Sequence, residues 1–230
     1  MKAMRKIAGL FSTAMLAFAL AACITWTTAG DEPRAEIAGS LDAAANGSCG
    51  EDASSVDWDS LPQEVVAWVE VPGTNIDQPI AKADKQNPNA YLYLDALGRG
   101  NYGTPYIDAD CTVESLFVPV YGHNMSDGGA FADFAKFSDE AYARSHSVIN
   151  LHTRDGRKHE FEVIAVDIVN ANAEAMCPDF DDVEAITRQI AKSDTVIAEH
   201  GGVSKVFAFT TCSYQTDNSR TVVYASPISQ

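Results

Sequence analysis

The sequence predicts a mainly β, α+β domain built as a closed eight-stranded β-barrel with a few peripheral helices. Short apolar runs recur along the chain, separated by Gly, Pro and Asn, which is typical of strands joined by turns. Such a density of short strands favours a barrel. The chain has 230 residues, 46 % of them hydrophobic, so it is long enough to bury one sizeable core.

Eight strands and two helices are predicted after residue 64. The strands are Val65–Val71, Ile76–Ala81, Tyr102–Ile107, Leu116–Tyr121, Val148–Thr153, His159–Val169, Val206–Cys212 and Thr221–Ala225. The first helix covers Gly129–Arg144, in which Phe131, Phe134 and Phe137 recur at helical spacing and are expected to pack on the barrel. The second covers Asp182–Ser193 and has an acidic start, which suits the positive end of a helix dipole.

Residues 1–26 are predicted to be a signal anchor or a lipoprotein signal peptide. All the charges before Asp31 are basic and lie in the first six residues, and the apolar run Ile7–Trp26 is long enough to cross a bilayer once. Positive charge before such a run predicts a cytoplasmic N-terminus and an extracellular domain on the cell membrane. The stretch Leu20–Cys23 also resembles a bacterial lipobox, in which cleavage would leave Cys23 lipidated.

Residues 27–55 are predicted to be a stalk or linker, because they are rich in Ala, Gly, Ser, Asp and Glu and contain few large apolar residues. Residues 56–230 then form the globular domain. The formal net charge of −16 argues against nucleic acid as a partner and against adhesion to anionic lipid.

The chain contains five cysteines, and one of them stands out by its context. An oxidising exterior would permit a disulfide among Cys49, Cys111 and Cys177, but the sequence does not choose the pair, and unpaired buried thiols are an equal alternative. Cys212 differs from these three because it ends a predicted apolar strand.

The segment from residue 207 to 224 predicts an active site. One apolar strand ends at Cys212 and the next opens at Arg220, so antiparallel pairing would bring their Cα atoms to about 5 Å. A third apolar strand ends just before His123. A thiolate can attack a carbonyl, an imidazole can transfer the proton of the leaving amine, and a guanidinium can stabilise developing negative charge. This chemistry requires no metal and no cofactor.

The motifs around these residues resemble those of the sortase family, specifically class B. The matching stretches are Tyr121-Gly122-His123-Asn124-Met125, Thr210-Thr211-Cys212 with Arg220 eight residues on, Ala67 to Ile80, Tyr91-Leu92, and Gly103 to Asp108. The likeness runs from about Trp58 to the C-terminus. The chain differs from the family pattern in two places. Ala67 stands where the family commonly has Gly, and residues 208–212 read Ala-Phe-Thr-Thr-Cys where the family usually has Thr-Leu-Ser/Ala-Thr-Cys.

The resemblance implies a sortase-like barrel and a membrane-tethered cysteine transpeptidase of a Gram-positive cell surface. Cys212 would attack the carbonyl of a Thr in a short sorting motif, of an Asn-Pro-x-Thr type, carried by a surface protein. His123 would act as general acid and base, and Arg220 would stabilise the oxyanion and the substrate. An amine from a peptidoglycan precursor or from a pilin would then accept the acyl group.

Residues next to this trio are expected to contact the substrate. Asn124, Thr210, Thr211 and Ser213 offer amide and hydroxyl groups beside the predicted nucleophile. Tyr121 is expected either to form a wall of the substrate groove or to pack in the core.

Three alternative functions remain open. An L,D-transpeptidase also uses His, Cys and Arg, but its arginine or asparagine normally follows the cysteine by two residues, whereas here the separation is eight. A papain-like protease places cysteine before histidine, the reverse of the order in this chain. A non-catalytic surface lipoprotein that serves as a binding module fits the N-terminus, and it would leave His123, Cys212 and Arg220 far apart.

His152 and His159 flank the turn Asp155-Gly156 and suggest a metal-binding pair. A two-residue loop would place them opposite each other. The apolar pattern favours a register shifted by one residue, which pairs Leu151 with Phe161 and sends the two imidazoles to opposite faces. No metal site is therefore expected.

Overall fold

The structure is a computed structural model that describes residues 56–100, 102–174, 180, 182–198 and 203–228. Within these residues, nine strands belong to a single sheet. They are β1 (Val65–Glu70), β2 (Asp77–Lys82), β3 (Tyr106–Ile107), β4 (Phe117–Gly122), β5 (Val148–Thr153), β6 (Lys158–Asn170), β7 (Thr195–Val196), β8 (Val206–Cys212) and β9 (Ser219–Pro227).

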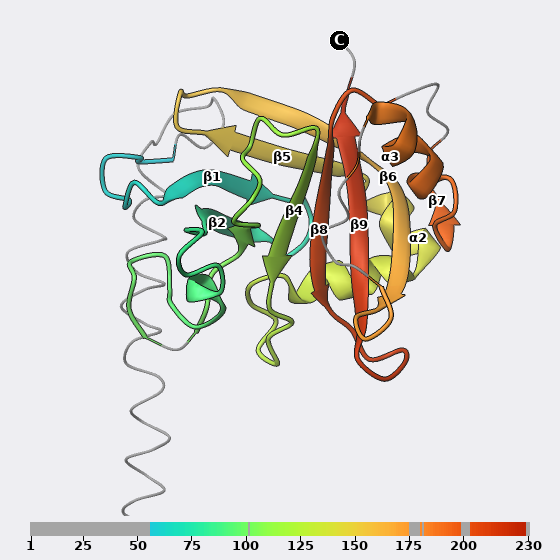
Figure 1. Cartoon of the computed structure of the whole chain (residues 1–230), viewed down its shortest axis with the longest axis horizontal. Coiled ribbons are helices and arrows are strands. Elements are labelled where there is room, and N and C mark those ends of the chain that lie inside the picture. The colour runs from blue at the N-terminus through green and yellow to red at the C-terminus, as the bar shows by residue number, and fades with distance from the viewer. Residues whose placement is uncertain (1–55, 101, 175–179, 181, 199–202, 229–230) are drawn as a thin grey trace, which may run out of the picture. The chain divides into compact units, whose positions relative to one another are not determined.

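The sheet closes into a barrel (Figure 1). The strand order is β5-β1-β2-β3-β4-β8-β9-β6-β7, and a further pairing of β5 with β6 joins the two sides. Eight strands form the closed ring, and the short β7 is added to β6. The predicted closed eight-stranded barrel is thus confirmed, and β7 is an element that the sequence analysis missed.

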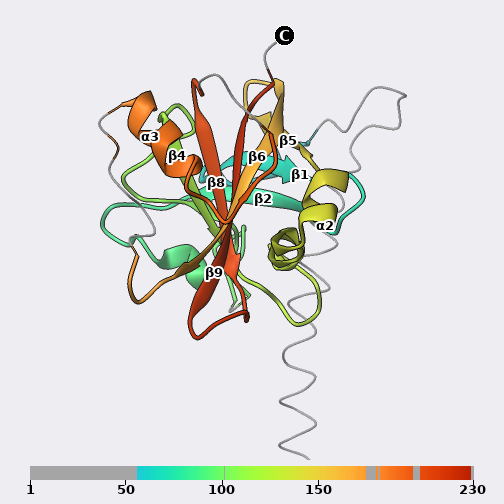
Figure 2. The ribbon, with the colours of Figure 1, turned by 90° about the vertical axis from the view of Figure 1, so that its right-hand side faces the viewer.

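Among the described residues, four helical segments lie outside the sheet. They are the 3-10 helices η1 (Ala90–Leu92) and η2 (Ala132–Ser138) and the α-helices α2 (Glu140–Ser145) and α3 (Val183–Ile190). Figure 2 shows α3 on one side of the strands and α2 on the other. The helix predicted over residues 129–144 is wrong as a single element, because Asp139 is extended and caps α2 by accepting a hydrogen bond from the backbone amide of Tyr142.

The side chains of each strand alternate between the barrel interior and its outer surface. On β8, Phe207 and Phe209 point into the main core, where Phe209 stacks on Phe134 of η2 and Phe207 packs edge-on against Phe161 of β6. Val206 and Ala208 point the other way and pack in a second cluster with Ile186 of α3. Residues at even positions of β8 therefore face outward, and Cys212 continues that series.

The hairpin of β5 and β6 has a register that differs from the predicted one. Leu151 pairs with His159, and His152 pairs with Lys158, so the strands are shifted by two residues from the prediction. A shift of two keeps every side chain on its face, so burial cannot distinguish the two registers. The hydrogen bonding of the turn sets the register, because the Thr153 amide donates to the Arg157 carbonyl oxygen at 3.0 Å. The two imidazoles lie on opposite faces, as predicted.

The first described residues are tied to the barrel by Arg154 at the β5–β6 turn. Its guanidinium donates to the carbonyl oxygens of Val65 at 2.6 Å, Trp58 at 3.1 Å and Leu61 at 3.0 Å, and also to that of Pro62. It also lies over the Trp58 ring, 5.4 Å from the centroid. This cluster fixes the point at which the chain enters the domain.

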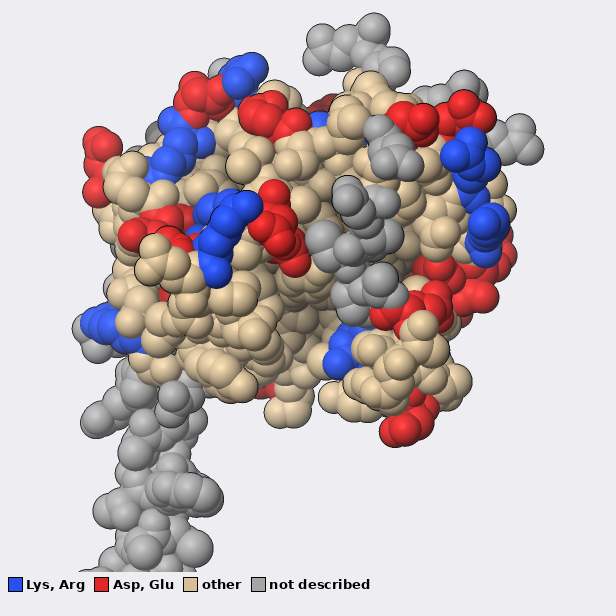
Figure 3. Space-filling view, in the orientation of Figure 1, with Lys and Arg blue, Asp and Glu red and all other residues tan. Residues whose placement is uncertain are grey.

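The predicted signal segment, the linker, Cys23, Cys49 and Cys177 all lie outside the described residues. In the part of the chain that the structure describes, no helix is long and apolar enough to span a membrane. Cys111 is half-buried and packs against the main core. Acidic and basic side chains are interspersed over the face shown in Figure 3.

Candidate active site

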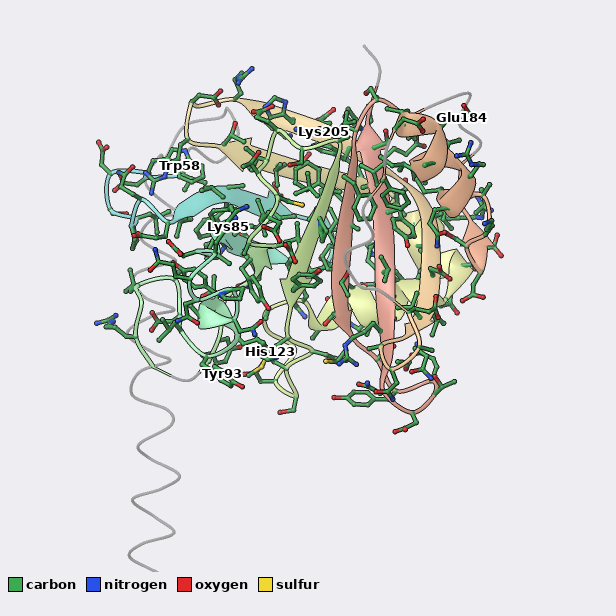
Figure 4. All side chains as sticks on the ribbon, viewed as in Figure 1. Trp58, Lys85, Tyr93, His123, Glu184 and Lys205 are labelled. Atoms are coloured by element: carbon green, nitrogen blue, oxygen red, sulfur yellow. The ribbon has the colours of Figure 1, made fainter. Side chains whose placement is uncertain are left out.

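Three strands bring the predicted catalytic residues into one row. Cys212 pairs directly with Arg220 in the antiparallel ladder of β8 and β9. Gly122, the last residue of β4, pairs with Thr211 in the parallel ladder of β4 and β8, so His123 follows at the level of Cys212. Figure 4 shows His123 just beyond the lower end of β4. The expected pairing of Cys212 with Arg220 is confirmed.

All three side chains line one pocket of about 210 Å³. They meet there because each continues the outward-facing series of its strand. The other lining residues are Tyr91, Leu92, Thr104, Tyr106, Tyr121, Gly122, Thr210 and Thr211. The alternative hypothesis of a non-catalytic binding module expected these three residues to lie far apart. Their convergence in one pocket argues against that hypothesis.

Asn124 fastens the loop after β4 to the nucleophile strand. Its side-chain amide donates to the carbonyl oxygen of Cys212 at 2.9 Å. On the other side, Asn124 forms an isolated bridge with Ala130, and the Phe131 amide donates to the His123 carbonyl oxygen at 2.9 Å. The backbones that carry the imidazole and the thiol are therefore joined by a short set of hydrogen bonds.

Arg220 is half-buried and is the second residue of β9. Its Nη1 donates to the carbonyl oxygen of Ser219 at 2.9 Å and to that of Asn218 at 3.3 Å. Asn218 has a positive φ of 52°, which turns the chain at the end of the β8–β9 loop. These bonds hold one side of the guanidinium against the loop, next to the pocket that the Cys212 side chain lines.

The imidazole of His123 is bound on its Nε2 side. Nε2 lies 2.7 Å from the carbonyl oxygen of Leu92, a residue of η1. Because a carbonyl oxygen only accepts, Nε2 must be the donor and carries a hydrogen. The segment between β2 and β3 therefore contributes directly to the candidate site.

Three tyrosines form one wall of the pocket. The rings of Tyr106 and Tyr121 are 5.5 Å apart between centroids, and those of Tyr91 and Tyr106 are 6.5 Å apart. Burial raises the pKa of Tyr106 to about 12, with a smaller contribution from Asp108, and burial also raises the pKa of Tyr91. Both phenols stay neutral at physiological pH, so this wall is apolar with hydroxyl groups at its edge.

The structure separates the five predicted substrate contacts into two groups. Tyr121, Thr210 and Thr211 line the pocket. The side-chain amide of Asn124 instead donates to the carbonyl oxygen of Cys212. The buried hydroxyl of Ser213 donates to the Ser219 hydroxyl at 3.1 Å, across the β8–β9 loop.

The sequence analysis gave no role to four pocket residues, Tyr91, Leu92, Thr104 and Tyr106. They belong to the segment between β2 and β3 and to β3 itself, and their strand pairings are long-range. The stretches Tyr91-Leu92 and Gly103 to Asp108 match the family motifs, and this match was the sequence feature that could have assigned these residues to the site.

A larger hollow of about 770 Å³ lies at the other end of the barrel. Lys205 lines it, and Figure 4 shows Lys205 and His123 at opposite ends of the molecule. The cationic side chains that line this hollow are engaged: Arg157 pairs with Asp155, Lys158 with Glu160 and Lys205 with Glu114, and Arg154 donates to backbone carbonyl oxygens. Size alone therefore does not identify the reactive site, whereas the convergence of thiol, imidazole and guanidinium does.

The described residues contain no group of three or more His, Cys, Asp or Glu side chains placed to hold a metal ion. His152 lies 3.9 Å from Glu70, and burial lowers its pKa more than this carboxylate raises it.

Comparisons with known proteins agree with this geometry. The family model of the sortase domain matches residues 69–228. Sortase B of Listeria monocytogenes is 26 % identical over 169 residues, which cover 70 % of this chain and 68 % of that protein.

Solved structures share the fold. The sortase B of Clostridium perfringens superposes with a TM-score of 0.63 at 24 % identity, covering 72 % of this chain and 94 % of that one. The sortase B of Bacillus anthracis gives a TM-score of 0.69 at 22 % identity, covering 86 % and 97 %. The chain therefore belongs to the sortase family of cysteine transpeptidases, and its relatives place it with class B.

Proposed function

We propose that this protein is a membrane-tethered transpeptidase of a Gram-positive cell surface that cleaves a sorting motif after Thr and joins the acyl group to an amine. Cys212 is the nucleophile, His123 the general acid and base, and Arg220 the stabiliser of the oxyanion. The observation that carries the proposal is the row of these three residues across β4, β8 and β9, all lining one pocket.

The first half of the reaction forms a thioester. His123 takes the proton of the Cys212 thiol as the sulfur bonds to the Thr carbonyl carbon of the sorting motif, and negative charge develops on the carbonyl oxygen. Arg220 stabilises that charge, because its guanidinium carries fixed donors next to the nucleophile. The C–N bond then breaks, and His123 gives a proton to the leaving amine.

The second half returns the enzyme to its starting state. An amine attacks the thioester carbon, His123 takes its proton, and the carbon–sulfur bond breaks to release the Cys212 sulfur, which regains a proton from His123. The acceptor is an amine of a peptidoglycan precursor or of a pilin lysine. Water in place of the amine would give hydrolysis only.

The wall of tyrosines supports a motif with an apolar residue ahead of Thr. The rings of Tyr91, Tyr106 and Tyr121 present neutral aromatic faces, on which a proline ring can pack. An Asn-Pro-x-Thr type of motif, which the family resemblance suggests, matches this surface.

The tether is proposed from the N-terminal sequence. Basic residues precede an apolar run long enough for one membrane crossing, which favours an anchor with the catalytic domain outside the cell. Cleavage before Cys23 and lipidation of that residue would give the same placement. Mass spectrometry of the membrane-bound protein distinguishes the two anchors, because only the lipoprotein form begins at a lipidated Cys23 and lacks residues 1–22.

The catalytic assignment is tested with the full-length protein in detergent micelles. It is mixed with a library of peptides that contain Pro-x-Thr and with a glycine or lysine peptide as the amine, and the products are read by mass spectrometry. We expect cleavage after Thr and a new amide bond to the added amine, both abolished in Cys212→Ala. Product formation that survives Cys212→Ala would refute the assignment.

A further inference from the structure

The imidazole of His123 is contacted by a segment that is distant in sequence. The hydrogen bond from Nε2 to the Leu92 carbonyl oxygen, 2.7 Å long, spans 31 residues. Because this bond requires the hydrogen on Nε2, the neutral ring has its lone pair on Nδ1. The bond therefore selects one of the two tautomers of the ring.

Gly103 closes the other side of this contact. Its φ is +80°, and a Cβ built there would lie 2.7 Å from Cδ2 of His123 and 3.0 Å from both Nε2 and the Leu92 oxygen. Real Cβ atoms essentially never lie 2.7 Å from another heavy atom, so any side chain at position 103 must displace the His123 ring. The absence of a side chain at this position is what lets the bond form.

Backbone bonds hold Leu92 and Gly103 in place. The Thr104 amide donates to the Tyr91 carbonyl oxygen at 2.9 Å, which closes the base of the loop one residue before Leu92 and one residue after Gly103. Within the loop, the buried Asp95 accepts hydrogen bonds from the amides of Leu97 at 2.8 Å and Arg99 at 2.9 Å. We call the two closing pairs, Tyr91-Leu92 and Gly103-Thr104, the loop neck.

We propose that the loop neck is a positioning element for proton transfer in this enzyme, and that Nδ1 is the atom of His123 that exchanges the proton. In the first half-reaction, Nδ1 takes the proton of the Cys212 thiol as the sulfur attacks, and the Nδ1–H bond so formed breaks as the leaving amine gains the proton and the scissile C–N bond opens. In the second, Nδ1 takes a proton from the attacking amine and passes it to the Cys212 sulfur as the carbon–sulfur bond breaks. The hydrogen on Nε2 stays bonded to Leu92 throughout. The inference rests on the proposed role of His123.

Gly103→Ala tests this inference against a matched control, Gly156→Ala. Gly156 has a similar φ of +77° in the β5–β6 turn, but a Cβ there would meet nothing within 4 Å. Both variants carry the same backbone strain, and only the first disturbs the imidazole. In the full-length protein, we expect kcat to fall about 100-fold for Gly103→Ala with KM changed less than about twofold, because misplacing a catalytic group by about 1 Å costs that much. Gly156→Ala should stay within about twofold of wild type.

A kcat for Gly103→Ala equal to that of Gly156→Ala would overturn the inference, given that both melt at the same temperature. It would leave the proposed function intact, since that depends on Cys212→Ala. If Gly103→Ala fails to fold, the tautomer of His123 is measured in the wild-type protein instead. Histidine-selective ¹⁵N labelling marks the five histidines, and the resonances lost in His123→Gln belong to His123. At a pH where His123 is neutral, we expect the hydrogen on Nε2, and a hydrogen on Nδ1 would refute the inference.

Discussion

The side-chain amide of Asn124 donates to the carbonyl oxygen of Cys212 at 2.9 Å. This contact joins the segment that carries the imidazole to the strand that carries the thiol. It links two residues that are 88 positions apart, and it fixes the height of Cys212 relative to His123.

Asn124→Ala should therefore lower activity more than stability. Loss of one such hydrogen bond costs about 1 kcal/mol, and we expect kcat/KM for peptide transfer to fall about tenfold through misalignment. Asn124→Asp should be worse, because a carboxylate cannot donate to the Cys212 carbonyl oxygen. Asn172→Ala is the control, since the amide pair of Asn172 with Asn218 is exposed. Equal kcat/KM for Asn124→Ala and Asn172→Ala would contradict the prediction.

Arg220 should be sensitive even to a substitution that keeps its charge. Arg220→Ala removes the proposed oxyanion stabiliser, and we expect a loss of about 100-fold or more in kcat. Arg220→Lys keeps a positive charge but not the planar set of donors, so it should recover only part of that loss. Steady-state kinetics of transfer measure both.

The exposed Arg188, paired with Glu184 on α3, provides the control substitution Arg188→Lys, which should not change kcat. Full activity in Arg220→Lys would show that charge alone is needed and that the geometry of the guanidinium is not used.

Asp167 on β6 should destabilise the fold at neutral pH. Burial raises its pKa, and Asp194 lies beside it: both carboxylates accept from the single amide of Ile168, at 3.1 and 2.9 Å. A pKa that is higher in the folded than in the unfolded state means that ionisation of Asp167 weakens folding. The cost disappears as the pH falls through the folded-state pKa.

Asp167→Asn should accordingly raise the free energy of unfolding at pH 7, and its advantage should shrink in acid. Urea unfolding at a series of pH values measures this. Asp217→Asn, at an exposed site in the β8–β9 loop, is the control and should leave the stability nearly unchanged. An Asp167→Asn protein that is no more stable than wild type at pH 7 would show that ionisation of the Asp167 carboxylate does not weaken folding.

His152 should make the fold sensitive to mild acid. Its pKa is lowered chiefly by burial, against the opposing attraction of Glu70 and Asp77 and with a smaller lowering from Lys158. The folded state therefore favours the neutral ring, while the unfolded chain takes up a proton below about pH 6.5. Stability should fall as the pH drops below that value.

His152→Gln should flatten this loss between about pH 7 and pH 5. His159→Gln is the control on the partner strand, on the opposite face of the same hairpin. Unfolding curves of both variants over this range provide the comparison, and a slope for His152→Gln identical to that of wild type would contradict the assignment.

Much of the barrel follows from local pattern. The bounds of β5 and β8 agree with the predicted strands, and most others differ by one or two residues. The predicted strand over residues 102–107 shrinks to Tyr106–Ile107, because the residues before it close the loop neck instead of pairing in the sheet. Phe131, Phe134 and Phe137 recur every third residue, a spacing that also suits the 3-10 helix observed.

The sequence by itself determined which groups carry the chemistry, because Cys212 and Arg220 stand at the facing ends of adjacent strands and a short loop leaves few ways to pair them. Only the tertiary structure decided how His123 is held. Its partners, Leu92 and Gly103, lie on a loop whose position depends on the pairing of β3 with β2 and β4. Those pairings involve backbone groups that every residue possesses, so their choice leaves no local pattern in the sequence.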